Sequence, residues 1–412
     1  MILGRLPGSR PRILVLNQYY WPGVEATAHL LSQLCPALAE AFDVTVVTGR
    51  LRGPAGLPGR QVVEGVEIVR VNSTSFDRRN LGLRALNYAT YLGQSLREGL
   101  ASEPPDIVLC MTDPPMLGDV GLVLARRFRV PLVVIAQDVF PEVAVALKRL
   151  DNPALIGLLR LLIRLYLERA DRIVAIGETM RERLERKGAS PAALSVIPNW
   201  VDTRAVTPQA KDNEWAREHG LADRFVVMHS GNIGHAQNLD ALIRASTFLR
   251  DLEDLAVVII GDGARRVELQ ELAGRLEADS VVFLPYQARE QVPYSLSTGD
   301  VHFVGLARGL AGYVVPSRLY GILAAGRPAI VAADAEGETA EVVERVGCGV
   351  VVPPGRPERL AEAIRRAHAG ELDLDELGRR GREYVVTEAD REVALSRYRE
   401  LLTQVLAGEP PR

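Results

Sequence analysis

Three observations predict an α/β fold with two Rossmann-like lobes, each a doubly wound parallel sheet. Short apolar runs that are typical of buried strands alternate with segments of helical periodicity. This alternation stops over residues 195–213, where Pro198 and Pro208 stand among polar residues, and then begins again. A length of 412 residues is also typical of two or three domains. Two such lobes would leave a cleft between them, the favoured place for a ligand.

The elements of the first lobe follow one another from Arg12. The apolar run RILVLNQYY predicts a strand, TAHLLSQLCPALAEA a helix and DVTVVTG a second strand. The same pattern then recurs with the strands DIVLCM, PLVVIAQDV and DRIVAIG and with the helices LGDVGLVLARRF and NPALIGLLRLLIRLYLERA. Such alternation predicts a parallel sheet that is covered by helices on both faces.

The second lobe repeats this pattern. Its predicted strands are RFVVMHS, LAVVII, SVVFLPY, DVHFVGLA and PAIVAA, and its predicted helices are NLDALIRASTFL, RRVELQELAGRLE and SRLYGILAAG. The tail from Gly378 to Leu406 is helical and charged. We therefore expect an N-terminal extension over 1–11, lobes over 12–200 and 201–384, and a C-terminal helix within 385–412.

Composition narrows the class of protein. A formal charge of -3 without a block of like charges argues against a nucleic-acid-binding protein. Cys35, Cys110 and Cys348 show neither zinc-site nor disulfide spacing, which fits a reducing cytoplasm. No apolar run is long enough to cross a bilayer, so we expect a cytoplasmic protein that at most rests on the inner face of the cell membrane.

Ligands of doubly wound sheets bind beyond the carboxyl ends of the strands, so the residues after each strand are candidates. In the first lobe, Gly23 permits a sharp turn before helix amides that could hold an anion, although a plain connecting turn is the alternative. Asp138 follows a buried strand, with Glu142 four residues later. Such a carboxylate can bind a sugar hydroxyl or take a proton, or it can cap the next helix.

In the second lobe, Gly231 and Gly234 flank Asn232 directly after a strand. Glycines there would let backbone amides face a phosphate, although the dinucleotide fingerprint GxGxxG is absent. His229 and His235 lack the helical spacing or the carboxylates of a metal site, and no metal is expected.

The window between Asp300 and Asp334 contains three arginines and no acid, although about four acids would be expected for its length. Pro316 and Ser317 predict the start of a helix, with Ser317 as its N-cap and Arg318 in its first turn. A cation at that end opposes the helix dipole unless an anion binds there. The window therefore indicates either a buried β-α-β unit, or an anion site formed by amides, a hydroxyl and a guanidinium.

The order of these motifs resembles the retaining nucleotide-sugar glycosyltransferases of family four, which have the GT-B fold. The resemblance spans nearly all of the chain from Arg12 and is carried by RILVLNQYYWPGVEATA, IAQDVFPE, DRIVAIGETM, VIPNWVD, HSGNIGHAQNLD, IIGDG and VVPSRLYGILAAGRPAI. IPNWVD, SGNIG and PSRLYGILAAGRP resemble the branch that includes bacterial fucosyl and N-acetylfucosaminyl transferases of envelope polysaccharides.

The chain departs from the family pattern at five positions. The family's Glu-x7-Glu pair falls on Tyr313 and Gly321, so both glutamates are absent. The Arg and Lys that hold the donor diphosphate correspond to Asn232 and Gln237, and the sugar-contacting His corresponds to Gln137. We therefore expect diphosphate binding to shift to the PSR segment.

The resemblance implies transfer of a sugar from a nucleoside diphosphate sugar, with UDP favoured, to an acceptor glycan, lipid-linked sugar or small molecule, with retention and without a cofactor. It also implies donor binding in the second lobe, acceptor binding in the first, and a last helix that returns to the first lobe. The alternatives are a nucleotide-sugar 2-epimerase, a specialised-metabolite glycosyltransferase, an NAD-dependent oxidoreductase and a non-catalytic sensor. The expected donor-binding residues are Gly231, Asn232, Gly234, Gln237, Gly261, Tyr286, Pro316, Ser317, Arg318 and Tyr320.

The remaining candidates belong to the first lobe and its end. Asp138 is the expected catalytic residue, with Glu142 and Glu25 as alternatives, and Gly23, Gln137 and Asn199 are expected to face the cleft. The segments 83–100 and 154–170 mix Leu and Tyr with Arg, as a helix at a membrane interface would. For the second segment, a core helix with exposed arginines is the favoured interpretation.

Overall fold

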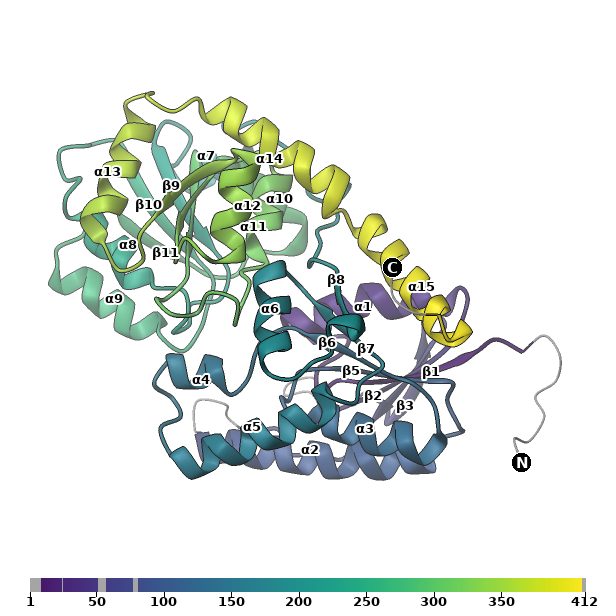
Figure 1. Ribbon diagram of the computed structural model, residues 1–412. Coiled ribbons are helices and arrows are strands. Elements are labelled where there is room, and N and C mark those ends of the chain that lie inside the picture. Colours follow the sequence, from purple (N-terminus) through teal and green to yellow (C-terminus); the bar gives the residue numbers. More distant parts are fainter. Residues whose placement is uncertain (1–8, 24, 51–56, 77–80, 410–412) are drawn as a thin grey trace. The chain divides into compact units, whose positions relative to one another are not determined.

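The structure, a computed structural model, describes residues 9–23, 25–50, 57–76 and 81–409 (Figure 1). Residues 1–8 of the expected N-terminal extension lie outside these ranges. The chain forms two compact units, the first of residues 1–145, 150–197 and 395–412 and the second of 146–149 and 198–394. Each unit is built on one sheet with helices on its faces, so the predicted α/β class with two parallel-sheet lobes is confirmed.

The sheet of the first unit has the strand order β3-β4-β2-β1-β5-β6-β7-β8. All neighbouring strands are parallel except the pair β3 and β4. The central strands β5 and β6 are apolar throughout and buried, and β1 is apolar and buried after Arg12, as expected for a sheet covered on both faces. The bounds are β1 (Arg12–Leu16), β2 (Asp43–Thr48), β3 (Arg60–Val63), β4 (Val66–Arg70), β5 (Ile107–Met111), β6 (Leu132–Ala136), β7 (Arg172–Ala175) and β8 (Leu194–Val196).

Strands β3 and β4 were not predicted, because the segment RQVVEGVEIVR has no long apolar run. They form an edge hairpin whose turn contains Glu64 and Gly65, both at positive φ. Only β4, the inner strand of the two, is largely buried. An edge strand with one exposed face alternates in exposure, and four residues of such alternation are too short to identify it.

The helices of the first part of the chain connect these strands. Asn152 caps α5 by accepting a hydrogen bond of 3.0 Å from the Leu155 amide, and Pro153 occupies the first turn. Helix α3 packs beside α2 and beside α5, so the three lie in one layer (Figure 1). The bounds are α1 (Ala26–Ala39), α2 (Leu81–Ala101), α3 (Leu117–Phe128), α4 (Glu142–Ala146), α5 (Pro153–Leu167) and α6 (Glu178–Arg186).

The sheet of the second unit is wholly parallel, with the order β11-β10-β9-β12-β13-β14. Central strand β9 sends Val227 into one buried cluster and Val226 and Met228 into another, so its two faces are both covered. The bounds are β9 (Phe225–Ser230), β10 (Leu255–Ile260), β11 (Val281–Leu284), β12 (Val301–Gly305), β13 (Ala329–Ala332) and β14 (Gly349–Val352).

The second unit contains more elements than were predicted, namely the short helices α7 and α10, the helices α12 and α13, and the strand β14. The predicted C-terminal helix is two helices, because the chain leaves the helical path at Ala389 and Asp390. The bounds are α7 (Glu214–Glu218), α8 (Leu239–Ser246), α9 (Arg266–Arg275), α10 (Val292–Thr298), α11 (Arg318–Ala324), α12 (Glu338–Val346), α13 (Pro357–His368), α14 (Leu374–Glu388) and α15 (Arg391–Ala407).

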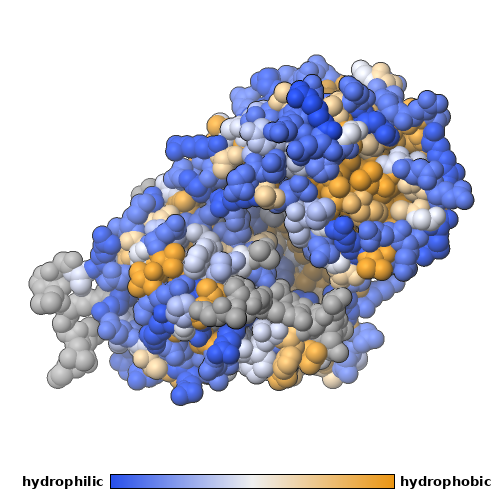
Figure 2. Space-filling view, turned by 180° about the vertical axis from the view of Figure 1, so that it is seen from behind, coloured by the Kyte–Doolittle hydropathy of each residue, from blue (hydrophilic) through white to orange (hydrophobic). Residues whose placement is uncertain are grey.

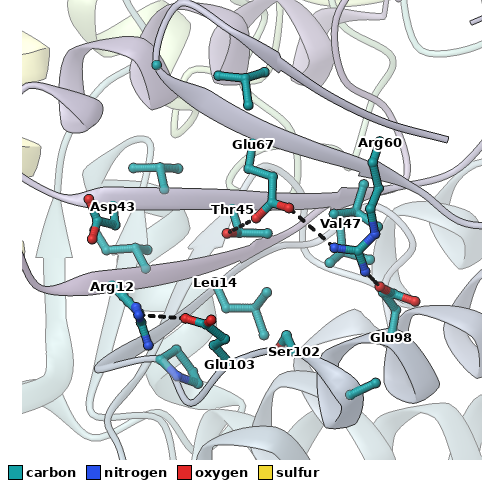
Figure 3. A pocket seen from close by; sticks show the side chains of 17 residues that line it. Arg12, Leu14, Asp43, Thr45, Val47, Arg60, Glu67, Glu98, Ser102 and Glu103 are labelled. Carbon is teal, nitrogen blue, oxygen red and sulfur yellow. Dashed lines mark hydrogen bonds and ion pairs between the residues drawn. The ribbon is translucent and has the colours of Figure 1, made fainter. Parts of the chain in front are cut away.

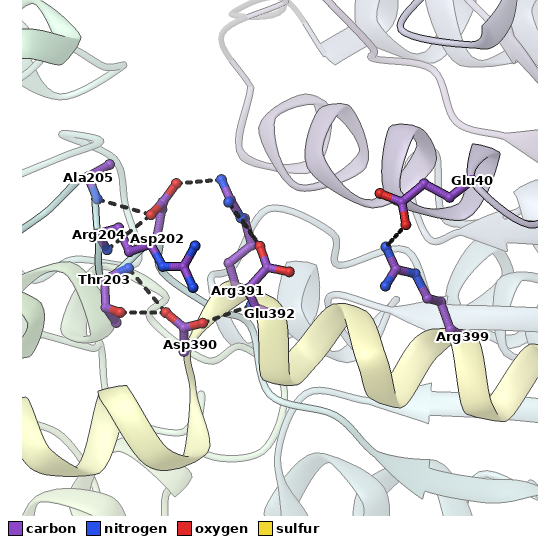
Figure 4. Close-up of polar contacts among 9 residues, drawn as sticks. All are labelled: Glu40, Asp202, Thr203, Arg204, Ala205, Asp390, Arg391, Glu392 and Arg399. Carbon is purple, nitrogen blue, oxygen red and sulfur yellow. Dashed lines mark hydrogen bonds and ion pairs between the residues drawn. The ribbon is translucent and has the colours of Figure 1, made fainter.

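The residues between α14 and α15 form polar contacts with the segment that follows Trp200 (Figure 4). Asp390 accepts hydrogen bonds from the hydroxyl of Thr203, at 2.5 Å, and from its amide, at 3.3 Å. Arg391 forms an ion pair with Asp202. The backbone is joined here as well, because the Val201 amide donates to Ala389 O at 3.1 Å and the Arg391 amide donates to Val201 O at 2.9 Å. Further along α15, Arg399 pairs at 2.7 Å with Glu40, which directly follows α1, within the first unit.

The face of the molecule in Figure 2 is mainly hydrophilic, with apolar residues gathered in separate patches. In the described part of the chain, no helix combines the length and the apolar character that a bilayer-spanning segment requires. Helix α5 is in part the core helix that was favoured, since Leu159, Ile163 and Tyr166 are buried. Its leucines at 155, 158 and 161 are exposed, however, which that interpretation did not anticipate.

The close packing of α14 on α11 yields a test of stability. A Cβ atom on Gly378 would lie 2.1 Å from the carbonyl oxygen of Gly326, so Gly378→Ala must displace the backbone. We expect a loss of about 1–3 kcal/mol in the free energy of unfolding, measured by chemical denaturation. Gly274 of α9, where a Cβ meets nothing within 4 Å, is the matched control. Gly274→Ala should raise stability by up to about 1 kcal/mol. Equal stability of the two variants would contradict the close contact between Gly378 and the Gly326 carbonyl.

Candidate functional site

In the second unit, the loops after β9 and β10 lie against each other at the carboxyl edge of the sheet. Gly261 has φ +135°, and a Cβ there would lie 1.9 Å from the carbonyl oxygen of Gly231. A Cβ on Gly263 would lie 2.3 Å from the carbonyl oxygen of Ile233, and one on Gly305 2.1 Å from that of Gln237. Side chains are therefore excluded at these positions, and the glycines bring three strand-end loops into backbone contact.

The amides of the loop Gly231–Gly234, expected to face a phosphate, are largely engaged within the protein. The Gly231 amide donates to Ile260 O at 2.9 Å, and the Ile233 amide donates to Asp262 O at 2.9 Å. The Gly234 amide donates to Oε1 of Gln237 at 3.0 Å. The prediction of an amide-lined anion site is corrected, because the loops satisfy these donors among themselves, and Gln237 serves as a brace of the loop.

Arg318 and His229 form the polar centre of this edge. Arg318 is the first residue of α11, and its Nη1 lies 3.0 Å from Nδ1 and 3.3 Å from Nε2 of His229. His229 is fully buried at the end of β9. Burial and the charge of Arg318 lower the pKa of His229 well below its usual value, so the imidazole is neutral and accepts from the guanidinium.

The charge of Arg318 has no counter-ion within the part of the chain that the structure describes, where the residue forms no ion pair. The side chain is half-buried, and burial lowers its pKa to about 10 while Tyr286 acts in the opposite direction. A Cβ on Gly231 would lie 3.9 Å from Nε of Arg318, so the guanidinium lies along the glycine loop. A desolvated cation without a partner is costly, and an anion bound here would relieve that cost.

The other donor-binding candidates lie in different environments. Ser317 precedes α11 as predicted, but its hydroxyl makes no capping hydrogen bond. Tyr286 is 57% exposed, and its hydroxyl reaches Asp262 O at 3.4 Å. Tyr320 is only 3% exposed, and Pro316 is also buried, so we assign both to the core instead of to a ligand surface.

In the first unit, Asp138 lies among polar residues from the ends of β5 and β6. Burial and the negative charge of Asp113 raise the pKa of Asp138 to about 7, while the Thr112 hydroxyl and the Arg84 guanidinium act in the opposite direction. Its Oδ1 is buried and accepts no hydrogen bond from the described residues. Arg84 is itself held by Tyr88 at 2.7 Å. A carboxyl group with such a pKa can both accept and donate a proton near neutral pH.

Glu142, the alternative catalytic residue, is held in ion pairs. It contacts Lys187, and its Oε1 lies 3.0 Å from Nε of Arg160. Burial raises the pKa of Glu142, but the hydrogen bond and charge of Lys187 outweigh it, so the net shift is downward. Glu142 is therefore an ionised structural partner, unsuited to donate a proton. Glu25 directly precedes α1, without a side-chain cap.

The loop residues that were expected to face a cleft differ in position. The Gly23 amide donates to Tyr20 O at 2.8 Å, which closes the predicted sharp turn. Gln137 precedes Asp138, and the backbone amide of Gln137 donates to Thr112 Oγ1 at 3.0 Å. Asn199, which follows β8, is buried. The structure thus places Gln137 next to the candidate acid.

Sequence reasoning missed several neighbours of these sites. His229 was weighed only as a metal ligand, and nothing in the sequence pairs it with Arg318. Asp113 directly follows the buried strand β5, so inspection of every strand end could have found it. Arg84 comes from α2, and no local pattern links that helix to Asp138. In the described ranges, no group of three His, Cys, Asp or Glu side chains is placed to hold a metal ion.

A pocket of about 440 Å³ also opens in the first unit, between the strands β1 to β4 and the end of α2 (Figure 3). It contains none of the candidate residues. Arg60 pairs with Glu67 at 3.3 Å and also with Glu98, while Arg12 pairs with Glu103 at 2.5 Å. Because its arginines are already paired, the pocket offers no evident site for an anion.

The raised pKa of Asp138 predicts a pH dependence of stability. The folded protein holds a proton on Asp138 that the unfolded chain releases above about pH 4, so this residue lowers the free energy of unfolding as pH rises toward 7. Asp138→Asn should therefore become more stable relative to the wild type over that interval, as measured by denaturation at several pH values. Asp279→Asn, which changes an exposed carboxylate, serves as the control, and a constant difference for Asp138→Asn would contradict the raised pKa.

Known families match both halves of the chain. Residues 23–200 match the family described as "Glycosyl transferase 4-like domain", and residues 211–384 match "Glycosyl transferases group 1". The putative colanic acid biosynthesis glycosyl transferase WcaI of Escherichia coli is 31% identical over 56% of this chain and 57% of its own length. The probable glycosyltransferase WbjE of Pseudomonas aeruginosa is 27% identical over 89% of this chain and 91% of its own.

A solved structure agrees in fold. Anabaena HepE, solved in complex with UDP, superposes with a TM-score of 0.73 at 16% identity, over 95% of this chain and 100% of its own. These matches give no support to the 2-epimerase alternative. Because glycosyltransferase families cover both halves and each unit carries the expected parallel sheet, the chain belongs to the glycosyltransferases of the GT-B fold.

Proposed function

We propose that this chain transfers a sugar from a UDP-linked donor to an acceptor in polysaccharide or glycoconjugate synthesis, with retention of configuration. The observation that carries the proposal is Arg318, a half-buried cation that forms no ion pair in the described part of the chain. A nucleoside diphosphate would supply the missing negative charge. The names of the relatives from Escherichia coli and Pseudomonas aeruginosa, and the UDP complex of Anabaena HepE, support the class of reaction.

The donor site in this proposal is the edge formed by Arg318, Asn232 and Tyr286. The guanidinium donates to the diphosphate and stabilises the charge that develops as the sugar–phosphate bond breaks. Neutral His229 accepts a hydrogen bond from the guanidinium and adds no competing charge. The exposed side chains of Asn232 and Tyr286 remain for the nucleoside or the sugar. Since Arg318 supplies the positive charge, we expect no divalent ion to be needed.

The acceptor is proposed to bind at Asp138 in the first unit. Its carboxylate would take the proton of the acceptor hydroxyl, whose oxygen bonds to the anomeric carbon on the same face from which the nucleoside diphosphate leaves with the electron pair. Attack on that face is what retention requires of a single displacement. The buried Oδ1 without a hydrogen-bond donor and the pKa near 7 suit this role. The family resemblance supports a fucosyl or N-acetylfucosaminyl group as the transferred sugar and an envelope polysaccharide as the product.

The donor site can be tested by nucleotide binding. In the presence of EDTA, UDP at a hundredfold excess over Kd should stabilise the protein by about 2.7 kcal/mol, with GDP, ADP, dTDP and NAD as comparisons. Arg318→Ala should weaken UDP binding by about 1.5–3 kcal/mol, which is the range for hydrogen bonds to charged groups. The matched control is Arg327→Ala, because Arg327 lies in the same acid-free window but beyond the far end of α11. An equal loss of UDP affinity in both variants, or an unchanged UDP affinity in Arg318→Ala, would contradict the role of Arg318 in donor binding.

The role of Asp138 requires a different measurement. Asp138→Asn should lower the rate of sugar transfer by about 10²–10⁴-fold, the usual contribution of a general base, and leave UDP affinity unchanged. Transfer is followed as release of UDP from UDP-sugars in the presence of candidate acceptors. Wild-type transfer rates in Asp138→Asn would refute its catalytic role while leaving the donor site intact. Transfer only to a small natural product would favour the specialised-metabolite alternative.

A further inference from the structure

Helix α5 carries a row of leucines that are exposed among the residues the structure describes. Leu155, Leu158 and Leu161 are 44%, 52% and 58% exposed. They follow one another at a spacing of three residues and therefore lie on one side of the helix. Leu159 and Ile163 are buried in the unit's own core. Leu158 and Leu161 point away from that buried side, whereas Leu155, four residues before Leu159, lies at its edge.

The neighbouring helices extend this apolar row into a surface. Helix α3 packs against both α2 and α5, and the three form one layer (Figure 1). Val123 of α3 is 50% exposed, and Leu86 and Leu100 of α2 are 45% exposed. The remaining exposed positions of α2 include alanines and glycines, which add no charge. We call the exposed side of these three helices the α2–α3–α5 face.

The charges on this face have one sign. Its exposed charged residues are all arginines, namely Arg97, Arg126, Arg127, Arg160 and Arg164, and none of the exposed positions within α2, α3 and α5 that the structure describes is acidic. Arg160 and Arg164 are paired with Glu142 and Glu168, outside the exposed row. Arg97 and Arg126 form no ion pair in the described part of the chain. The face thus combines exposed leucines with uncompensated guanidinium groups.

We propose that the α2–α3–α5 face docks on the surface of an anionic phospholipid bilayer. Leucines on the side of a helix bury in the region between headgroups and acyl chains, and nearby arginines interact with negatively charged headgroups. Arginine side chains suit this position because their aliphatic stems lie along apolar surface while the charged ends stay hydrated. This proposal goes beyond sugar transfer and does not depend on it.

A second copy of the chain fits the same face less well than a bilayer does. Two copies related by a two-fold axis would bring the same patch against itself. Arg97 and Arg126, which form no ion pair in the described part of the chain, would then add their positive charge from both copies to one interface, and like charges in contact are unfavourable. An anionic lipid surface instead supplies the missing negative charge over the whole face.

The test is flotation of the purified full chain with lipid vesicles, without any nucleotide sugar. We expect the protein to float with vesicles of phosphatidylglycerol and phosphatidylcholine, to remain behind with phosphatidylcholine alone, and to dissociate as salt is added. Leu158→Ser combined with Leu161→Ser should weaken the binding by about tenfold or more. Arg97→Glu combined with Arg126→Glu should weaken it by a similar factor.

A matched control distinguishes binding through this face from non-specific binding through other exposed apolar residues. Phe248 and Val267 of the second unit are 51% and 68% exposed, so Phe248→Ser combined with Val267→Ser removes comparable apolar surface elsewhere and should leave flotation unchanged. Absence of binding to anionic vesicles, or equal weakening in the control, would overturn the proposal. So would a dimer, seen by light scattering, that the Leu158 and Leu161 changes dissociate. Since donor binding is measured separately, loss of vesicle binding and loss of UDP binding are distinguishable.

Discussion

The parallel pairing of strands is the constraint on which the rest of this structure depends. In both sheets every pair of neighbours is parallel except β3 and β4. Parallel strands bring their carboxyl ends, and the loops that follow them, to one edge of the sheet. Gly231 and Gly261 therefore meet in the second unit, as Asp113 and Asp138 do in the first. The chemistry gathers where the topology puts the strand ends.

Backbone contact at this edge decides which groups remain for a ligand. The glycine loops approach so closely that a Cβ on Gly261 or Gly305 would overlap a carbonyl oxygen. At such distances the loops form hydrogen bonds with one another, and the amides of Gly231 and Gly234 donate to acceptors within the protein. In the proposed function, recognition of an anion therefore falls to a side chain, that of Arg318, which lies along the loop.

The two units contain opposite electrostatic situations. In the second unit the guanidinium of Arg318 has no counter-ion among the described residues. The histidine next to it is kept neutral by burial and by that same positive charge. In the first unit two carboxyl groups, Asp113 and Asp138, share a partly buried site, so one of them retains its proton at higher pH. The proposed function assigns a negative group to the first of these sites and proton transfer to the second.

The sequence by itself determined the α/β class, the two sheets and the central strands, because runs such as RILVL and LAVVII are long enough to identify buried parallel strands. It also singled out Asp138 and Arg318 as candidates, because each stands at the end or beginning of a predicted element, and their roles stay predictions. It failed for short or edge elements such as β3, where four residues of alternating exposure carry little signal.

Only the tertiary structure decided the partners of these residues. It brought His229 within hydrogen-bond distance of Arg318, paired Glu142 with Lys187 and buried Tyr320 in the core. Each of these outcomes depends on contacts between elements that are far apart in the chain. Local periodicity reports which side of an element is apolar, but it carries no information about which distant charge or backbone group that side will meet.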